Sequence, residues 1–415
     1  MRSKPTHVNT IRQIPVVGNT AAAVIYVLLA VAVLGALCVL LHRPRRIAWA
    51  AGSTLLLLAA SVFALTVWPK PFPDAVPVRI YAAGAAAVFI AFAAVFAPRR
   101  RLPLVLLAVP SLFLGYLGAN LVYEQYPTVG SFHPDPVTVS MSLDEFQSRT
   151  SAPLLGDREV GALVTLPAEP MRDAIAYVPP AYFHGATLPV VVLLAGQPGM
   201  PSGWFTDGQA DRVADDFQQE HGGRAPIVVS VDGTGSATGN PACVDGPNAK
   251  MQTYLAEDIP AMVKRNFRVV QDQSKWTIGG LSYGGTCALQ VITNAPDAYG
   301  TFLDFSGEPE PSIGSHEKTV NELFGGDEEA FRDVNPSTLL VRAAGSQKYT
   351  HIAGRFVAGE SDPMASRALP YLNALAQKAG MASTYTALPG GHSYQVWRVA
   401  LRDNFGFAAE RGDIK

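Results

Sequence analysis

The clearest chemical motif in this sequence is a serine flanked by glycines, Gly280-Leu281-Ser282-Tyr283-Gly284. A short strand-like run at Trp276–Ile278 precedes it, and a helical run at Thr286–Thr293 follows it. In this context the pattern is typical of a sharp strand-to-helix turn that exposes the serine hydroxyl, because glycines on either side let the two backbones pass without side-chain clashes. The motif predicts that Ser282 is a nucleophile.

A histidine and a carboxylate must accompany this serine, because its hydroxyl needs a base to take its proton and the base needs an acid to orient it. In the α/β-hydrolase fold the order along the chain is serine, acid and then histidine. His392 fits best, since it lies in a glycine-rich loop after the strand-like run Thr384–Leu388 and near the end of the chain. His351 precedes the candidate acid and would break this order.

Two carboxylates compete for the position of the acid, Asp362 and Glu360, in the loop after the strand-like run Arg355–Ala358. We favour Asp362, because a turn that begins at Gly359 needs a few residues before a side chain can point back toward the histidine. Asp is also the commoner acid in this fold. Glu360 stays open as the alternative.

An oxyanion hole requires two backbone N–H groups that face the negative oxygen formed during acyl transfer. The residue after the nucleophile, Tyr283, is expected to supply the first. The loop after the early central strand supplies the second, and here Ala195–Gly199 follows the strand-like run Val190–Leu194. Gln197 is therefore the expected donor, with an ordinary Gly/Pro turn as the alternative for this loop.

These loops need a sheet that brings them to one edge. In the second part of the chain, short runs rich in β-branched residues alternate with helical patterns, which is typical of a mostly parallel sheet with helices on both faces. The fold class expected is α/β, an α/β-hydrolase domain over 153–415, with its chemistry at the carboxyl ends of the strands. The expected strands are Ala174–Val178, Val190–Leu194, Ile227–Val231, Trp276–Ile278, Thr301–Phe305 and Arg355–Ala358, with helices at Tyr254–Phe267 and Met364–Ala379 among them.

Residues 1–123 differ in composition from the rest of the chain. Up to Tyr123 the only acidic residue is Asp74, whereas Lys and Arg together number 11. Four apolar stretches lack the polar face of a soluble helix and are long enough to span a bilayer. They predict an all-α transmembrane region of four helices, followed by a polar linker over 124–152. The helices are expected at about 21–41, 47–68, 80–97 and 104–123.

Arginines in the short loops predict how this region lies in the membrane. Three arginines fall within residues 43–46 and three more at 99–101, and four spans place both loops on the same side. Positive charge in short loops marks the cytoplasmic side, so we expect a multi-pass protein of the cell membrane whose catalytic domain is extracytoplasmic. Arg2, Lys4 and Arg12 oppose this orientation, because they would also lie outside.

Cys243 and Cys287 are candidates for a disulfide, because the expected orientation places both in an oxidising compartment. Two buried free thiols are the alternative. Cys38 lies inside the first apolar stretch.

The charge of the second part excludes one class of partner. Residues 124–415 contain 21 basic and 33 acidic residues, and such an acidic chain is a poor ligand for nucleic acid. No zinc-ligand spacing, Walker loop or dinucleotide fingerprint occurs, so neither a metal nor a cofactor is implied. Four aspartates between Asp207 and Asp216 have the spacing of one helix face, which we expect to be solvated rather than to hold a cation.

Several motifs can be compared with a known family: Leu193–Gly199, Asn240–Asp245, Thr253–Leu255, Gly280–Thr286, and Gly391–Tyr394 with Trp397. Together they resemble the esterase D and antigen 85 mycolyltransferase group, most closely its actinobacterial members with N-terminal transmembrane helices. The resemblance covers about Val160–Leu401 and implies a triad of Ser282, His392 and an acid at Asp362 or Glu360. The family commonly has His-Gly in the early loop and Trp after His-Ser, where this sequence has Ala195 and Tyr394.

The expected function is hydrolysis of carboxylic esters, of acyl or lipid type, at the cell envelope through a Ser-His-Asp triad and an acyl-enzyme. Transfer of the acyl group to a sugar hydroxyl, as in a mycolyltransferase, would use the same residues, so the motifs do not separate these reactions. A peptidase is a weaker alternative, and a non-catalytic envelope scaffold with the same fold is the alternative of a different class. The expected partners are an acyl ester, an envelope lipid or glycolipid, and the membrane itself.

Overall fold

The computed structural model describes residues 7–68, 70 and 75–415. The chain divides into two compact units, Met1–Pro134 and Asp135–Lys415, which are described separately. Arg2, Lys4 and Asp74, which enter the charge pattern of the N-terminal region, lie outside the described residues.

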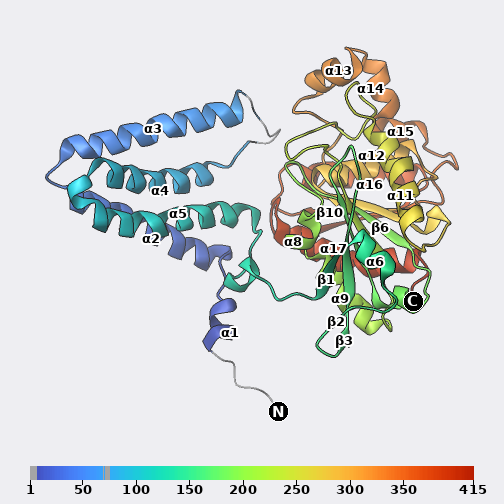
Figure 1. Cartoon of the computed structure of the whole chain (residues 1–415). Coiled ribbons are helices and arrows are strands. Elements are labelled where there is room, and N and C mark those ends of the chain that lie inside the picture. The colour runs from blue at the N-terminus through green and yellow to red at the C-terminus, as the bar shows by residue number, and fades with distance from the viewer. Residues whose placement is uncertain (1–6, 69, 71–74) are drawn as a thin grey trace. The chain divides into compact units, whose positions relative to one another are not determined.

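The first unit is helical in its described part, and its long helices run alongside one another (Figure 1). Four of them are long and apolar enough to cross a membrane. Large apolar side chains cover their outer surfaces, and Leu34, Leu56 and Leu106 are 61%, 74% and 67% exposed. Lipid accommodates such surfaces, whereas water opposes them. The elements are α1 (His7–Arg12), α2 (Gly18–Leu40), α3 (Pro44–Thr66), α4 (Val78–Phe96), η1 (Pro98–Arg100), α5 (Arg101–Tyr123) and η2 (Val129–Phe132).

Small residues allow the helices of this unit to approach closely. A Cβ atom added to Gly118 on α5 would lie 2.5 Å from the Cβ of Ala83 on α4, and one added to Gly115 would lie 3.1 Å from that of Ala87. Close backbone contact through Gly and Ala is how helices associate in lipid, where apolar burial by itself supplies no driving force. The contact between α4 and α5 therefore suits a membrane.

The second unit is built on a nine-stranded sheet with the order β1-β4-β5-β7-β6-β8-β9-β10-β11. Among its described strands, β5 alone runs antiparallel to both neighbours, and the other adjacent pairs are parallel. This confirms the expected α/β-hydrolase fold class. The strands are β1 (Thr138–Ser142), β4 (Gly161–Leu166), β5 (Ala174–Val178), β6 (Val190–Leu194), β7 (Ile227–Val231), β8 (Thr277–Leu281), β9 (Thr301–Phe305), β10 (Ala353–Gly359) and β11 (Ala382–Leu388), and β2 (Leu154–Leu155) and β3 (Arg158–Glu159) form a separate hairpin.

Helices cover both faces of this sheet (Figure 1). Along the fully buried strand β6, Val190, Val192 and Leu194 join one apolar cluster, whereas Val191 and Leu193 join another. Side chains alternate between the faces of a strand, so a continuous apolar run serves two cores. The first core includes α11 (Ile259–Asn266), α12 (Tyr283–Asn294), α15 (Pro336–Arg342) and α16 (Ala365–Lys378), and the second includes α8 (Gly203–Thr206), α9 (Ala210–Glu220) and α17 (Tyr394–Arg411).

The remaining helical elements of this unit are short. They are α6 (Leu143–Ser148), α7 (Pro180–Phe183), α10 (Met251–Thr253), the π-helical turn η3 (Tyr254–Asp258), η4 (Gln273–Lys275), α13 (His316–Phe324) and α14 (Glu328–Val334). The helix expected over Tyr254–Phe267 is therefore divided between η3 and α11.

Part of the linker expected over 124–152 belongs to the second unit. Residues 138–148 form β1 and α6, and β1 pairs in parallel with β4. Met141 and Phe146 are buried in the first core. Five alternating residues are a weak strand signal by themselves, and this strand forms because β4 offers an edge for it to pair with.

The acidic face of α9 is not solvated throughout, which corrects the expectation for the aspartates between 207 and 216. Asp215 is only 2% exposed, and both of its carboxylate oxygens accept hydrogen bonds from Nη1 of Arg158 at 2.9 Å. Burial raises the pKa of Asp211 to about 6. The charge that makes burial of Asp215 tolerable comes from the β2–β3 hairpin, 57 residues earlier, so helical spacing could not reveal it.

Candidate active site

Ser282 occupies a strained turn between β8 and α12. Its φ of 54° and ψ of −123° lie where a residue with a side chain is rarely found. A Cβ added to Gly280 would lie 2.3 Å from the carbonyl carbon of Gly284, and one added to Gly284 would lie 2.1 Å from the carbonyl oxygen of Leu194. The turn can therefore form only with glycine at both positions.

The structure brings Ser282, His392 and Asp362 into one line of hydrogen bonds. Nε2 of His392 lies 2.9 Å from the hydroxyl of Ser282, and Nδ1 lies 2.7 Å from Oδ2 of Asp362. Because an ionised carboxylate only accepts, Nδ1 donates to Asp362 and Nε2 is left to accept the serine proton. The three side chains follow β8, β11 and β10, whose carboxyl ends lie at the same edge of the sheet.

Asp362 is held as a buried carboxylate, with 1% of its surface exposed. Burial opposes its ionisation, but hydrogen bonds from His392 and from the backbone N–H groups of Ala365 and Met364 outweigh it and keep the pKa of Asp362 below its usual value. The side chain of Glu360, the competing acid, is exposed instead. Of the two candidates, Asp362 is the one that bonds to His392.

The loop Ala195–Gly199 lies against the nucleophile, as an oxyanion hole requires. A Cβ added to Gly196 would lie 3.4 Å from the Cβ of Ser282. The side chain of Gln197 donates to the carbonyl of Thr238 at 3.0 Å. The N–H of Tyr283 opens α12, where a residue has no acceptor within its own helix.

Trp397 on α17 supports the imidazole from the side. Its ring meets that of His392 edge to face, with centroids 4.9 Å apart, and Tyr394 packs against Trp397 at 5.0 Å. Tyr394 stands where the esterase D and antigen 85 group commonly has Trp. In this protein a tyrosine therefore packs beside the ring that contacts His392.

Cys243 and Cys287 form a disulfide, as expected. Cys287 lies on the first turns of α12, five residues after Ser282, so the bond ties the loop around Cys243 to the helix that begins at the nucleophile. Cys38 is a free cysteine on α2.

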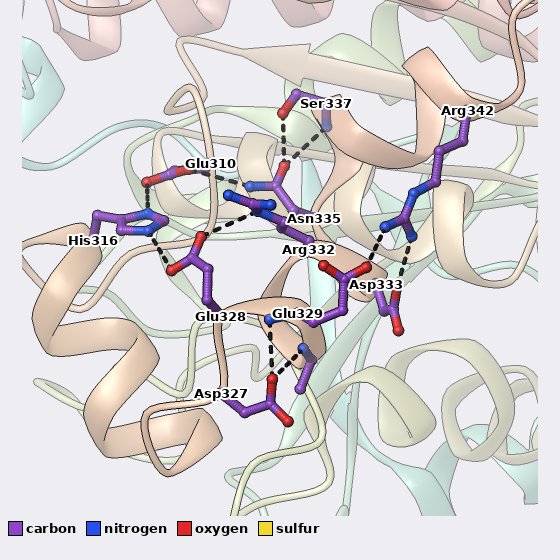
Figure 2. A network of polar contacts seen from close by, with 11 residues as sticks. Glu310, His316, Asp327, Glu328, Glu329, Arg332, Asp333, Asn335, Ser337 and Arg342 are labelled. Atoms are coloured by element: carbon purple, nitrogen blue, oxygen red, sulfur yellow. Dashed lines mark hydrogen bonds and ion pairs between the residues drawn. The ribbon is translucent and has the colours of Figure 1, made fainter.

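The other histidines after Ser282 have partners elsewhere. His316 on α13 lies between Glu310 and Glu328, with its two ring nitrogens 2.9 and 3.0 Å from their carboxylates (Figure 2). These hydrogen bonds raise the pKa of His316. Nε2 of His351 lies 3.0 Å from the carbonyl oxygen of Pro296. Both therefore contribute to structure away from the nucleophile.

Two features that adjoin loops of the site were not predicted from the sequence. One is an ion pair between Arg172 and Asp232, 60 residues apart, which no local motif marks. The other is an apolar groove of about 580 Å³ that adjoins the loop of Asp362. It is lined by Pro309, Pro363, Met364, Arg367, Ala368 and Tyr371.

The fold and this arrangement define a class, the serine hydrolases and acyltransferases built on the α/β-hydrolase fold. This chain belongs to the Esterase family, whose family model matches residues 169–408. It is a serine esterase or acyltransferase, which acts on esters and carries candidate membrane helices.

Individual proteins are also similar to this chain in sequence. An uncharacterized protein of Corynebacterium glutamicum is 50% identical over 378 residues, which cover 88% of this chain and 88% of that protein. Since residues 124–415 make up only about 70% of the chain, this match extends into the helical region. The S-formylglutathione hydrolase of Paracoccus denitrificans is 26% identical over 192 residues, 42% of this chain and 66% of its own.

A solved structure supports the fold. The S-formylglutathione hydrolase of Agrobacterium tumefaciens superimposes with a TM-score of 0.51 at 21% identity, covering 61% of this chain and 95% of its own. At this identity the likeness shows the α/β-hydrolase fold of the second unit and nothing of the substrate.

Proposed function

We propose that this protein is a serine esterase that hydrolyses acyl esters at the outer face of the cell membrane. Ser282 is the nucleophile, His392 the general base and acid, and Asp362 the carboxylate that orients the imidazole. The observation that carries the proposal is the pair of hydrogen bonds, 2.9 and 2.7 Å long, that joins these three side chains.

In the first half of the reaction, the Ser282 oxygen attacks the ester carbonyl while Nε2 of His392 takes the hydroxyl proton. The carbonyl oxygen becomes an oxyanion, which the N–H groups of Gln197 and Tyr283 stabilise. The acyl–oxygen bond then breaks, and His392 gives its proton to the departing alcohol. In the second half, His392 activates a water that releases the acid and restores Ser282.

The groove beside the acid loop favours an apolar acyl ester as the substrate. Its lining offers mostly carbon atoms, and Met364 and Tyr371 are 45% and 59% exposed there. Exposed apolar surface that adjoins the loop of the catalytic acid is suited to bind a hydrocarbon chain. A lipid of the envelope meets this requirement.

The first unit supports an extracytoplasmic active site. The N–H of Val16 donates to the carbonyl of Pro127 at 3.0 Å, and that of Val129 to Ile14 at 2.9 Å, so the segments before α2 and after α5 lie on one side of the helices, as four spans require. The arginines at 43–46 and 99–101 lie in the opposite loops, and positive charge in short loops favours a cytoplasmic location for those loops. The Cys243–Cys287 disulfide agrees with an oxidising compartment.

Thiol labelling of introduced cysteines tests this orientation in a Cys38→Ser background, in which the remaining native cysteines, Cys243 and Cys287, are paired. An impermeant maleimide should label Glu220→Cys in intact cells and Arg45→Cys only after the membrane is permeabilised. Both positions are exposed, so accessibility within the protein is matched. The reverse pattern would contradict an extracytoplasmic catalytic unit.

The full chain in detergent, assayed on p-nitrophenyl esters of increasing acyl length, tests the proposed reaction. We expect release of free acid without any added acceptor, and a kcat/KM that rises from acetyl to longer acyl groups, because each methylene that enters the groove adds about 0.8 kcal/mol of favourable burial. Turnover that appears only with a sugar acceptor would favour the acyltransferase instead. A folded chain that neither turns over nor reacts with a fluorophosphonate would favour the non-catalytic scaffold.

A further inference from the structure

An ion pair with a buried carboxylate lies behind the loop Ala195–Gly199, here called the oxyanion loop. Asp232, which directly follows β7, is 1% exposed. Nε and Nη2 of Arg172, in the turn between β4 and β5, donate to its two oxygens at 2.9 and 2.6 Å. Backbone N–H groups of Thr234 and Gly235 add bonds of 2.9 and 3.0 Å to Asp232. The carboxylate is thus bound on all sides and holds Arg172 in one orientation.

The remaining donor of Arg172 reaches the oxyanion loop itself. Its Nη1 donates to the carbonyl of Gly199 at 2.8 Å, and its Nη2 also donates to the hydroxyl of Thr234 at 2.6 Å. The N–H of Gly199 donates in turn to Ala237 at 3.3 Å. Both backbone groups of Gly199 are therefore fixed by the turn after β7 and by the arginine that this turn holds.

Gly199 contacts the residues of the loop that lie next to the nucleophile. A Cβ added to Gly199 would lie 2.2 Å from the carbonyl oxygen of Gly196, so the two ends of this loop touch. Gly196 in turn lies against Ser282. A displacement of Gly199 must therefore move Gly196 and Gln197 relative to the serine.

We propose that the Arg172–Asp232 pair is a positioning device that aims the N–H of Gln197 at the oxyanion. This inference rests on the proposed function, since it concerns the same serine reaction. Neither side chain touches the substrate, and both act through Gly199. An oxyanion donor is effective only when it is preorganised toward the developing charge, so a small displacement reduces the rate without removing any catalytic group.

The charge state of the pair supports this role at working pH. Burial opposes the ionisation of Asp232, but hydrogen bonds from Arg172 and Thr234 outweigh it and hold the pKa of Asp232 below its usual value. The carboxylate therefore remains ionised at neutral pH, and its bond to the guanidinium persists there.

Conservative variants of this pair test the inference in the full chain. Arg172→Lys keeps a positive charge near Asp232, but one ammonium cannot reproduce the planar fork that also reaches Gly199. We expect kcat on a p-nitrophenyl ester to fall about 10- to 100-fold with KM changed less than about threefold. Binding of a trifluoromethyl ketone, whose adduct with Ser282 carries an oxyanion, should weaken by the same factor, and Asp232→Asn should behave alike.

The Arg158–Asp215 pair is the matched control. It is also a buried carboxylate held by an arginine, with both oxygens at 2.9 Å, but its bonds are to α9 and not to the oxyanion loop. Arg158→Lys and Asp215→Asn should lower the melting temperature comparably yet leave kcat within about threefold. Equal losses of kcat in both pairs, or an unchanged kcat in Arg172→Lys, would overturn the inference while leaving the esterase intact. A wild-type chain without turnover would overturn the proposed function and this inference with it.

Discussion

Replacement of Ser282 by alanine should lower kcat for ester hydrolysis by at least about 10⁴-fold and abolish reaction with a fluorophosphonate. The variant loses the atom that forms the acyl-enzyme and its hydrogen bond to His392. We expect the backbone turn to persist, because alanine has nearly the same backbone preferences as serine at this position. Steady-state assays of the full chain compare kcat of the variant with that of wild type, and the melting temperatures of both are measured in parallel. We expect the melting temperature to stay within a few degrees of wild type.

Ser306 supplies a matched control for this experiment. It too lies at the carboxyl end of a parallel strand with a positive φ, 57°, and is 1% exposed. Ser306→Ala should retain kcat within a few-fold. His392→Ala should lose about as much as Ser282→Ala, and the double variant no more, because side chains that act as a unit are not additive. Losses of kcat that add up in the double variant would contradict the assignment of Ser282 as the nucleophile. Reaction of Ser282→Ala with the fluorophosphonate would contradict it as well.

Replacement of Asp362 by asparagine should lower kcat by about 10⁴-fold with KM little changed. The amide can still accept the backbone N–H groups of Met364 and Ala365 through its oxygen, so the loop should keep its shape. Its NH₂ group, however, faces Nδ1 of His392 and favours the tautomer that carries its proton on Nε2. That tautomer cannot accept the proton of Ser282.

Glu360→Gln is the control for this second experiment, because Glu360 was the competing acid and lies two residues away on the same loop. Its side chain is exposed, so we expect kcat within about threefold of wild type. A larger loss in Glu360→Gln than in Asp362→Asn would reverse the assignment of the acid. Comparable losses in both would indicate that the loop as a whole, rather than one carboxylate, had been disturbed.

Much of the sheet could be predicted from the sequence. The runs expected at Ala174–Val178, Val190–Leu194, Ile227–Val231 and Thr301–Phe305 are strands with those bounds in the structure. Each is a short, mostly apolar run with most of its residues buried on both faces, which is a strong strand signal for a single sequence. β1 and β4 were not predicted, and the residues of β1 were assigned to a linker. These strands lie at the end of the sheet, where exposed polar residues interrupt the apolar pattern.

The residues of the candidate site also differ in how far the sequence alone could identify them. Ser282 could be singled out because glycines two residues away on each side dictate the turn around it, and His392 because a glycine-rich loop near the chain end had few competitors. The choice between Asp362 and Glu360 had to rest on a preference, since both carboxylates follow the same strand. Their catalytic roles stay predictions for the variants described above.

The sequence by itself determined the features that neighbouring residues impose on one another: the serine turn, the long apolar helices and the buried strands. Their causes are local, because steric clashes at glycines and the apolar length of a helix act within a few residues. Only the tertiary structure decided that Asp362 and not Glu360 reaches His392, that Asp215 is buried against Arg158, and that Arg172 holds Asp232 and Gly199 together. These contacts join residues up to 60 positions apart. The contacts of Arg172 arise because the sheet places β7 between β5 and β6, an order that differs from their order in the chain.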